Sequence, residues 1–421
     1  MKKTAVVTIA SENYFAQVQT LLQSLQETNP QWDRFFAVVD NPDEDLYQAL
    51  TLTDTGLITM DELDIPDLND MKFRYDIMEL NTAIKPFVLL NLLKKYERVI
   101  YLDPDIRVYA EMKAVNKAFN EGYHFVLIPH FNDYFEDDGF HPDEPDIMRA
   151  GIYNFGFFAS DNSTEAIKAI KWWAKRLETL CINKQSEGIF VDQKWGDLLP
   201  GRHDKVFILR DHGYNVAYWN LSHRKVSFKD DKYYVNDDEL VFFHFSGFDP
   251  KQLDNISKHQ NRYAMSDIGV AKNLFYEYAK AVVDNNCDEW RKKKYSFASF
   301  ADGRYICDVF RKLYRENVEV ENKVRSSNPF NCSCFFYDNK QWLAPFLINY
   351  AFNTHQQMGV YLINTNKDQW VMWFHDVLKN EYKLDNEWID FATYFLRNHL
   401  YRVYKEGKKT FLNRLIYKLK R

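Results

Sequence analysis

The chain begins with a short run of apolar, largely β-branched residues that predicts a buried strand. Residues 4–10 read TAVVTIA, and the polar corner SENY follows at 11–14. Apolar residues then recur at helical spacing, at Phe15, Val18, Leu21, Leu22 and Leu25. A strand, a polar corner and an amphipathic helix form the typical opening of an α/β protein.

Further buried strands are predicted along the first 260 residues, with helices between them. One strand ends on Asp40 and another, RVIYL, ends on Asp103. A helix is expected at 79–96, with Pro86 near its start, because an interior proline would break it. Later strands are predicted at 124–129, 153–160, 205–210 and 240–247. This alternation indicates a mostly parallel sheet covered by helices on both faces.

After about residue 255, long helical patterns replace the strands. The segments 269–285 and 388–406 are helical in their spacing, with Tyr, Phe and Trp among the apolar members. We therefore expect an α/β catalytic domain at 1–260 and a mainly helical region at 261–421. No Gly- or Pro-rich linker marks the boundary between them.

Charge is distributed unevenly along the chain. The formal net charge is −6, but the segment from Arg397 to Arg421 has nine Lys or Arg and one acid, so it carries +8 and the rest carries −14. Nucleic acid is a poor partner for so acidic a body. The basic tail places apolar residues on one helical face, which predicts an interfacial anchor to an anionic membrane surface. These residues are Phe411, Leu412, Leu415, Ile416 and Leu419. The alternative is a solvated helix that packs on the body.

The five cysteines are scattered and odd in number, which fits a reducing cytoplasm rather than a disulfide framework. Cys332 and Cys334 lack the spacing of a zinc site. The apolar stretch after Met1 is too short for a signal peptide, and no apolar run reaches the roughly 18 residues of a membrane span. We expect a cytoplasmic protein, peripheral on the cytoplasmic face of the inner membrane through its tail.

Two acids follow the buried strand that ends at residue 102. Asp103 and Asp105 flank Pro104, and residues two apart on a strand point to the same side. Converging carboxylates match a hard cation with oxygen ligands, Mg²⁺ or Mn²⁺. His244 interrupts a later apolar strand, LVFFHFSG, and an imidazole added to two carboxylates shifts the preference toward Mn²⁺. The bland alternatives are a polar turn after a strand and a core histidine with satisfied ring nitrogens.

Several motifs in order then carry a family resemblance. YLDPDI, YNFGFF, VDQKW and HFSGF, together with ELNTAIKPFVLLNLL and VFILRDHGYNVAYWNL, resemble metal-dependent retaining glycosyltransferases of the GT-A fold. The similarity is to the family-eight-like branch of bacterial cell-surface polysaccharide synthesis, and it covers about residues 4–265. The C-terminal third matches no family that we can name. The resemblance implies a UDP-sugar donor, a glycan or lipid-linked acceptor, and Mn²⁺ or Mg²⁺ as cofactor.

The resemblance also implies roles for individual residues. Asp103, Asp105 and His244 match the metal ligands, and Asp103 also contacts the nucleotide diphosphate. The uridine corner corresponds to Ile9, Ala10, Asn13 and Tyr14, although Ser11 replaces the usual acid there. Three further residues match the catalytic groups near phosphate and sugar, namely Lys85, Asp192 and Gln193. The donor-sugar motif corresponds to Asn154 and Gly156. Gly247, shortly after His244, permits close approach of the backbone to a ligand. Pro250 stands where a diphosphate-binding cation is expected, so that role passes to Lys251 or Lys258.

Each of these residues also has a plain structural interpretation. Tyr14 could start a helix, Lys85 could be a solvated helix residue, Asn154 could lie in a turn, and Asp192 with Gln193 could cap a helix. Two other functions stay open as well. A nucleotidyltransferase or phosphoryl-transfer enzyme could use the same acids, but it should carry a Gly-rich phosphate loop. A non-catalytic glycan-binding protein should have lost metal ligands.

Overall fold

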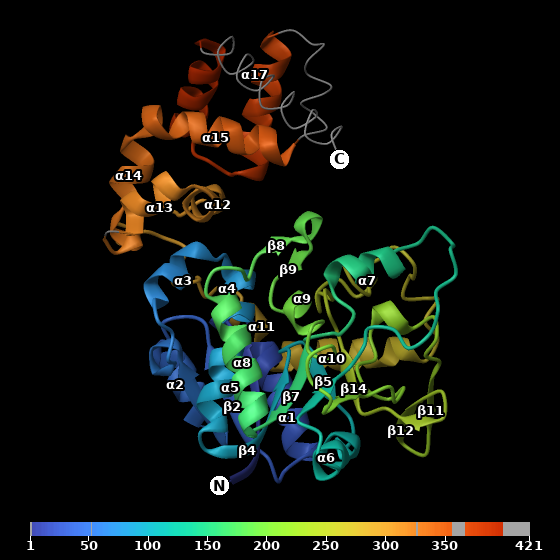
Figure 1. The fold of residues 1–421 in the computed structure, drawn as a ribbon. Coiled ribbons are helices and arrows are strands. Elements are labelled where there is room, and N and C mark those ends of the chain that lie inside the picture. The colour runs from blue at the N-terminus through green and yellow to red at the C-terminus, as the bar shows by residue number, and fades with distance from the viewer. Residues whose placement is uncertain (1, 52, 326, 356–366, 399–421) are drawn as a thin grey trace. The chain divides into compact units, whose positions relative to one another are not determined.

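The core of the first part of the chain is one seven-stranded sheet. In the computed structural model, which describes residues 2–51, 53–325, 327–355 and 367–398, the strand order is β10-β6-β7-β4-β1-β2-β3. Every neighbouring pair is parallel except those made by β7, which runs antiparallel to both β4 and β6. The predicted α/β fold with a mostly parallel sheet is confirmed (Figure 1).

The strands of this sheet are short and largely buried. Their bounds are β1 Lys2–Ala10, β2 Asp33–Val38, β3 Thr55–Thr59, β4 Tyr96–Leu102, β6 Phe125–Leu127, β7 Phe157–Asp161 and β10 Val206–Ile208. The strand predicted at 153–160 begins only at Phe157, because residues 154–156 form the turn that precedes β7. That turn lies at the functional edge described below.

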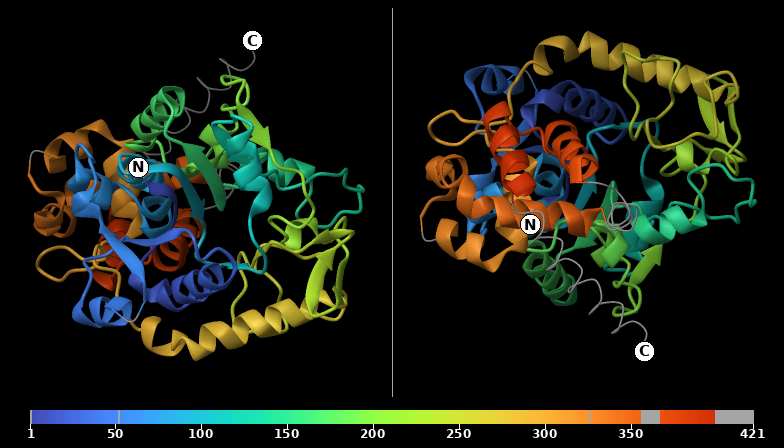
Figure 2. Two further views of the ribbon diagram at one scale, coloured as in Figure 1. Left: turned by 90° about the horizontal axis from the view of Figure 1, so that it is seen from below. Right: turned by 90° about the horizontal axis from the view of Figure 1, so that it is seen from above.

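Helices cover both faces of the sheet. On one face α1 (Phe15–Thr28) and α6 (Lys113–Asn120) share a core with β4 and β7, and α10 (Ala271–Asp284) lies beside α1 (Figure 2). On the other face α5 (Lys85–Leu93) packs on β4 and α8 (Thr164–Leu177). Instead of the single predicted helix at 79–96, the chain forms α4 (Ile77–Ala83) and α5. Pro86 lies in the first turn of α5, as expected of a residue without a backbone N–H.

The remaining elements of this part are short. The helices are α2 Glu44–Thr51, α3 Leu68–Arg74, α7 Glu144–Ala150, α9 Gln193–Gly196 and α11 Cys287–Trp290. The 3-10 turns are η1 Glu12–Tyr14, η2 Met60–Glu62, η3 Gln185–Glu187 and η4 Tyr218–Asn220. Two small antiparallel sheets are formed by β8 (Asn183–Lys184) with β9 (Ile189–Phe190), and by β11 (Val226–Lys229), β12 (Lys232–Val235) and β13 (Asp238–Glu239).

The strand that carries His244 is not part of the central sheet, which corrects the expectation that both motif strands belong to one sheet. After Asp105 the chain continues as β5 (Ile106–Val108), which pairs antiparallel with β14 (Phe242–His244) in a sheet of its own. The register places His244 opposite Ile106. The two motifs still meet, because this pairing begins one residue after Asp105.

The chain divides into two compact units, residues 1–71 with 77–296, and residues 72–76 with 297–421. The sequence placed the boundary at 260. Residues 261–296 group with the first unit because α10 packs on α1, and α11 packs on both α1 and η1. The assignment of catalysis to 1–260 remains a prediction.

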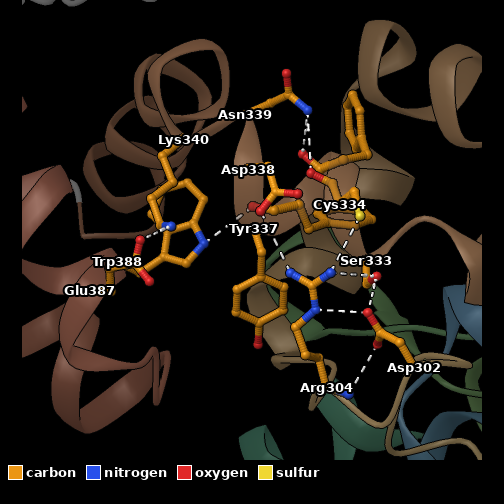
Figure 3. A network of polar contacts seen from close by, with 12 residues as sticks. Asp302, Arg304, Ser333, Cys334, Tyr337, Asp338, Asn339, Lys340, Glu387 and Trp388 are labelled. Atoms are coloured by element: carbon orange, nitrogen blue, oxygen red, sulfur yellow. Dashed lines mark hydrogen bonds and ion pairs between the residues drawn. The ribbon is translucent and has the colours of Figure 1, made fainter.

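The second unit is helical, as expected for the C-terminal region. Its elements are α12 Asp308–Glu316, α13 Val318–Arg325, η5 Pro329–Asn331, α14 Ser333–Asp338, α15 Lys340–Thr354, α17 Lys367–Asp376 and a π-helix at Val377–Glu381, and residues 386–398 are also helical. Trp388 is fully buried in its aromatic core and donates from Nε1 to the Phe336 carbonyl at 3.2 Å. Arg304 lies between Asp302, Ser333 and Cys334 (Figure 3).

None of the helices that the structure describes has both the length and the apolar character needed to cross a membrane. The apolar face predicted at 411–419 lies outside the described residues.

Candidate active site

The reversed direction of β7 determines which chain segments meet at the candidate site. β1 and β4 are parallel neighbours, so their carboxyl ends lie at one edge of the sheet. Because β7 is antiparallel to β4, with Leu102 opposite Phe157, the residues that precede β7 reach this same edge. The Asp103 N–H donates to the Gly156 carbonyl at 2.8 Å, which ties the two turns together.

Asp103, Asp105 and His244 converge at this edge, as the sequence predicts. His244 Nε2 lies 3.0 Å from Asp105 Oδ1 and 3.6 Å from Asp103 Oδ2. One ligand atom from each residue fits within a mutual distance of 4.8 Å. The Tyr101 hydroxyl donates to Asp103 Oδ1 at 2.5 Å and so orients that carboxylate. Two carboxylates and an imidazole are a donor set that suits a divalent cation such as Mn²⁺.

A glycine leaves space at the centre of this cluster. A Cβ on Gly156 would lie 2.4 Å from His244 Cε1 and 2.8 Å from both Asp103 Oδ2 and Asn154 Oδ1. Asn154 is buried, and its Oδ1 has no hydrogen-bond partner among the residues that the structure describes. A buried oxygen that faces the Asp103 carboxylate across the space at Gly156, without a donor, fits a site built to bind a cation.

Burial and mutual interaction shift the pKa values of the cluster. Burial raises the pKa of Asp103, and the positive charges of Lys85 and His244 offset part of that increase. Burial lowers the pKa of His244, but the neighbouring Asp105 and Asp103 carboxylates more than compensate, so it lies above the ordinary value. The paired acids therefore favour positive charge at this position.

Lys85 and Asp192 form a buried ion pair beside the cluster. Lys85 Nζ lies 2.5 Å from Asp192 Oδ2, and each side chain is only 2% exposed. The same ammonium donates to the Phe155 carbonyl at 2.8 Å and lies over the Tyr101 ring. Lys85 is therefore buried and fully engaged, unlike the solvated helix residue of the plain interpretation.

The side chain of Gln193 hydrogen-bonds to the turn that carries Asn154. Its Oε1 accepts from the Phe155 N–H at 2.9 Å, and its Nε2 donates to the Ala150 carbonyl at 3.1 Å. Phe155 is thus held on both sides, by Gln193 at its N–H and by Lys85 at its carbonyl. Asp192 stands at the N-cap of α9 but makes no side-chain capping bond. The catalytic roles of Lys85, Asp192 and Gln193 remain predictions.

The predicted uridine corner lies at the carboxyl end of β1. Ile9 and Ala10 are buried and pair with β2. Asn13 Oδ1 accepts from the Ser11 hydroxyl at 2.6 Å. Tyr14 is 45% exposed; partial burial raises the pKa of its phenol, and the negative charge of Asp105 raises it further.

The two candidate lysines after His244 differ in their surroundings. Lys251 Nζ contacts the carboxylate of Asp288 in an exposed ion pair. Among the described residues the exposed Lys258 ammonium makes no ion pair within 4.0 Å, while its N–H donates to the Gly247 carbonyl at 3.1 Å. Gly247 has φ +71°, and a Cβ there would lie 2.5 Å from His259 Cδ2. The left-handed backbone and the close ring explain the glycine.

His130 is a buried residue at the site that was not singled out from the sequence. His130 follows β6, and burial lowers the pKa of its imidazole to about 4. Trp219, in the motif VFILRDHGYNVAYWNL, is a sequence candidate for sugar recognition, with a buried core tryptophan as the alternative. Trp219 packs edge-on against both His130 and His244, with ring centroids 5.2 Å apart in each pair. The sequence signal for His130 is a polar residue directly after the apolar run 125–129, at a strand end. Asn220 and Arg224, from the same stretch as Trp219, hydrogen-bond to backbone carbonyls and serve the fold.

Comparison with known proteins gives distant similarities. No family model matches the chain. Two uncharacterized Bacillus subtilis (strain 168) proteins are similar in sequence: YfnF is 25% identical over 67% of this chain and 93% of its own, and YfnD is 24% identical over 70% and 93%.

Solved structures with partial similarity include three transferases. The galactosyltransferase LgtC, in complex with donor and acceptor sugar analogs, covers 66% of this chain and 95% of its own, with 14% identity and a TM-score of 0.42. GlyE from Streptococcus pneumoniae TIGR4 covers 71% and 66%, with 14% identity and a TM-score of 0.38. Mouse xyloside xylosyltransferase 1 covers 52% and 89%, with 16% identity and a TM-score of 0.34. Because these TM-scores are low, we assign the fold class from the strand order given above.

Proposed function

We propose that this chain is a metal-dependent glycosyltransferase of the GT-A type that transfers a hexosyl group from a UDP-sugar to a glycan or lipid-linked acceptor. The supporting observation is the convergence of Asp103, Asp105 and His244 around the space left by Gly156. This cluster stands at the carboxyl ends of parallel strands, where open α/β sheets bind their ligands. The nucleotide corner with Tyr14 follows β1, the parallel neighbour of β4, and so lies at the same edge of the sheet.

The three residues would hold Mn²⁺ or Mg²⁺. When bound, such a cation neutralises charge that develops on a leaving diphosphate. The chain's own groups then position the donor: Tyr14 offers an exposed ring for the uracil base, and Asn154 and Gly156 lie beside the sugar. Asp192, paired with Lys85, would add negative charge near a sugar carbon that becomes oxocarbenium-like.

The reaction is balanced without a dedicated base. The bond between the sugar's anomeric carbon and the phosphate oxygen breaks, and a bond from that carbon to the acceptor hydroxyl oxygen forms. In a retaining reaction both events occur on one face, so the leaving phosphate oxygen accepts the acceptor's proton. Gln193 would contribute by fixing the Phe155 turn, since both ends of its amide are bonded to backbone.

We place this activity in the synthesis of bacterial surface polysaccharide, at the cytoplasmic membrane. The +8 charge of residues 397–421 favours anionic lipid, at about 1 kcal/mol for each basic residue near the surface. In sedimentation with vesicles that contain anionic lipid, the full chain should pellet with the vesicles. A chain ending at residue 398 should stay in the supernatant. Equal amounts of the two chains in the pellet would contradict membrane binding through the tail.

Hydrolysis and transfer assays with a panel of nucleotide sugars test the proposed function. We expect UDP release from a UDP-sugar only when Mn²⁺ or Mg²⁺ is present, and none from Asp103→Ala. UDP together with Mn²⁺ should raise the melting temperature more than either alone. Undiminished turnover by Asp103→Ala would overturn the proposal. The intact ligand set weighs against a glycan-binding protein with a decayed site.

A further inference from the structure

His130 and Asn154 are two buried polar residues held at fixed positions beside the ligand cluster. They come from the facing ends of the antiparallel pair β6 and β7. The His130 N–H donates to the Ile152 carbonyl at 3.0 Å, and the Asn154 N–H donates to the Ile128 carbonyl at 2.9 Å. These two hydrogen bonds fix the backbone of both residues. The contacts of the side chains then decide how each side chain is oriented.

The contacts of His130 fix the orientation of the Asn154 amide. His130 Nδ1 faces the Ile152 carbonyl at 3.3 Å, so in the neutral ring this nitrogen carries the hydrogen. Nε2 is then an acceptor, and the Asn154 atom 3.1 Å away from it must be the donor Nδ2. The amide oxygen is consequently directed away from His130.

That oxygen faces the cluster and has no partner within the described structure. Asn154 Oδ1 and Asp103 Oδ2 each lie 2.8 Å from the point where a Gly156 Cβ would stand. Asn154 is only 7% exposed, and its Oδ1 accepts no hydrogen bond. A buried amide oxygen that faces a carboxylate oxygen across a small space, without a donor, is unfavourable unless a cation lies between them, and Asn carbonyls are ordinary ligands of hard cations.

Building on the proposed metal-dependent function, we propose that Asn154 Oδ1 is a further oxygen ligand of the cation, and that His130 is the positioning residue that keeps this oxygen directed at it. This goes beyond the resemblance, which implies a contact of Asn154 with the donor sugar. Trp219 keeps the arrangement rigid because its ring packs edge-on against His130 and His244 alike.

Titration of the full-length protein with Mn²⁺, without nucleotide sugar, tests this inference, and electron paramagnetic resonance of free Mn²⁺ gives the affinity. Asn154→Leu removes the oxygen, and His130→Phe removes the acceptor while it keeps a ring against Trp219. We expect each to weaken Mn²⁺ binding about 10-fold, as is typical when a ligand's support is lost. Because both act through one oxygen, the double variant should bind no more weakly than Asn154→Leu.

Two further variants serve as controls. His130→Gln can accept through its amide oxygen and should recover part of the affinity. His203 lies against Phe125, at the end of β6 that is opposite to His130. The variant His203→Phe should therefore bind Mn²⁺ as the unaltered protein does. Thermal unfolding shows which variants fold; if His130→Phe does not, Asn154→Leu and His130→Gln still decide the matter.

The outcomes separate this inference from the proposed function. Unchanged affinity in Asn154→Leu and His130→Phe, or losses that multiply in the double variant, would overturn the inference while unaltered protein still binds Mn²⁺. If the unaltered protein binds no Mn²⁺, the metal-dependent function fails together with it.

Discussion

Lys85 and Asp192 form an ion pair in the interior of the first unit, with Nζ 2.5 Å from Oδ2 and 2% of each side chain exposed. Burial raises the pKa of Asp192, and the positive charge of Lys85 offsets part of that increase. A pair this deep costs desolvation energy, so it is kept for what it positions rather than for stability alone. Here the ammonium also holds the Phe155 carbonyl, one residue from Asn154.

Replacing Lys85 with Met should destabilise the protein strongly. The change leaves Asp192 buried without its partner, which typically costs about 3–5 kcal/mol of unfolding free energy. Urea denaturation measures this loss. The double variant Lys85→Met/Asp192→Leu removes both charges and should regain most of the stability while transfer activity stays lost. If the single variant is as stable as the unaltered protein, the pair is not buried in solution.

Gly156→Ala should abolish metal binding and transfer while the protein stays folded. The new methyl group would occupy the point on which His244, Asp103 and Asn154 converge. Overpacking of this kind costs about 1–3 kcal/mol. Mn²⁺ titration and a melting curve measure the two effects.

Gly201→Ala is the matched control for that substitution. A Cβ at Gly201 would meet only the Leu198 carbonyl, at 3.8 Å. Its activity and melting temperature should not change. Normal Mn²⁺ affinity in Gly156→Ala would show that the cluster is not the metal site.

Gln193→Leu should lower stability as well as activity. The substitution leaves the Phe155 N–H and the Ala150 carbonyl without partners, which costs about 1–3 kcal/mol. Chemical denaturation measures the change, and the assays described above measure transfer. A purely catalytic Gln193 would instead give a variant of unchanged stability with reduced turnover.

Lys258→Ala should raise the KM for the nucleotide sugar, whereas Lys251→Ala should change it little. Lys251 is already paired with Asp288, while Lys258 is exposed beside Gly247 without an ion pair among the described residues. Losing one charge-assisted hydrogen bond to a diphosphate costs about 1.5 kcal/mol, or roughly 10-fold in affinity. Steady-state kinetics of both variants decide between the two lysines, and the reverse order would contradict this assignment.

The second unit should lose stability in acid, because the ionised Asp302 carboxylate contributes to its stability. Hydrogen bonds from Ser333 and Arg304 lower the pKa of this carboxyl from 3.8 to about 2 (Figure 3). Since the pKa is lower in the folded than in the unfolded state, the stabilisation is fully present above pH 3.8 and is lost as the pH falls toward 2.

Denaturation midpoints of the unaltered protein and of Asp302→Asn, measured from pH 6 to pH 3, test this dependence. Their difference should be largest near neutral pH and should shrink below about pH 4. Lys340→Met, which removes the ion pair with Glu387 in the same unit, is a control for loss of one charge. A difference that does not depend on pH would rule out the Asp302 contribution.

The sequence by itself determined the local elements and the ligand types. Hydrophobic periodicity and the polar residues after each apolar run depend on neighbours in the chain, so they predicted β1, α1, β4 and the placement of Asp103 and Asp105 at a strand end. They also predicted the helical character of the C-terminal region. The interrupted apolar strand singled out His244, the resemblance matched it to the third metal ligand, and the structure brings it within 3.0 Å of Asp105.

Only the tertiary structure decided which segments meet and which polar groups are buried. Strand direction and pairing depend on long-range hydrogen bonds, so the reversal of β7, which brings Asn154 and Gly156 to Asp103, leaves no local signal. For the same reason β14 was assigned to the central sheet but pairs with β5. The engagement of Lys85 with Asp192, and of His130 with Asn154, follows from packing between distant segments, where burial makes each polar group find a specific partner.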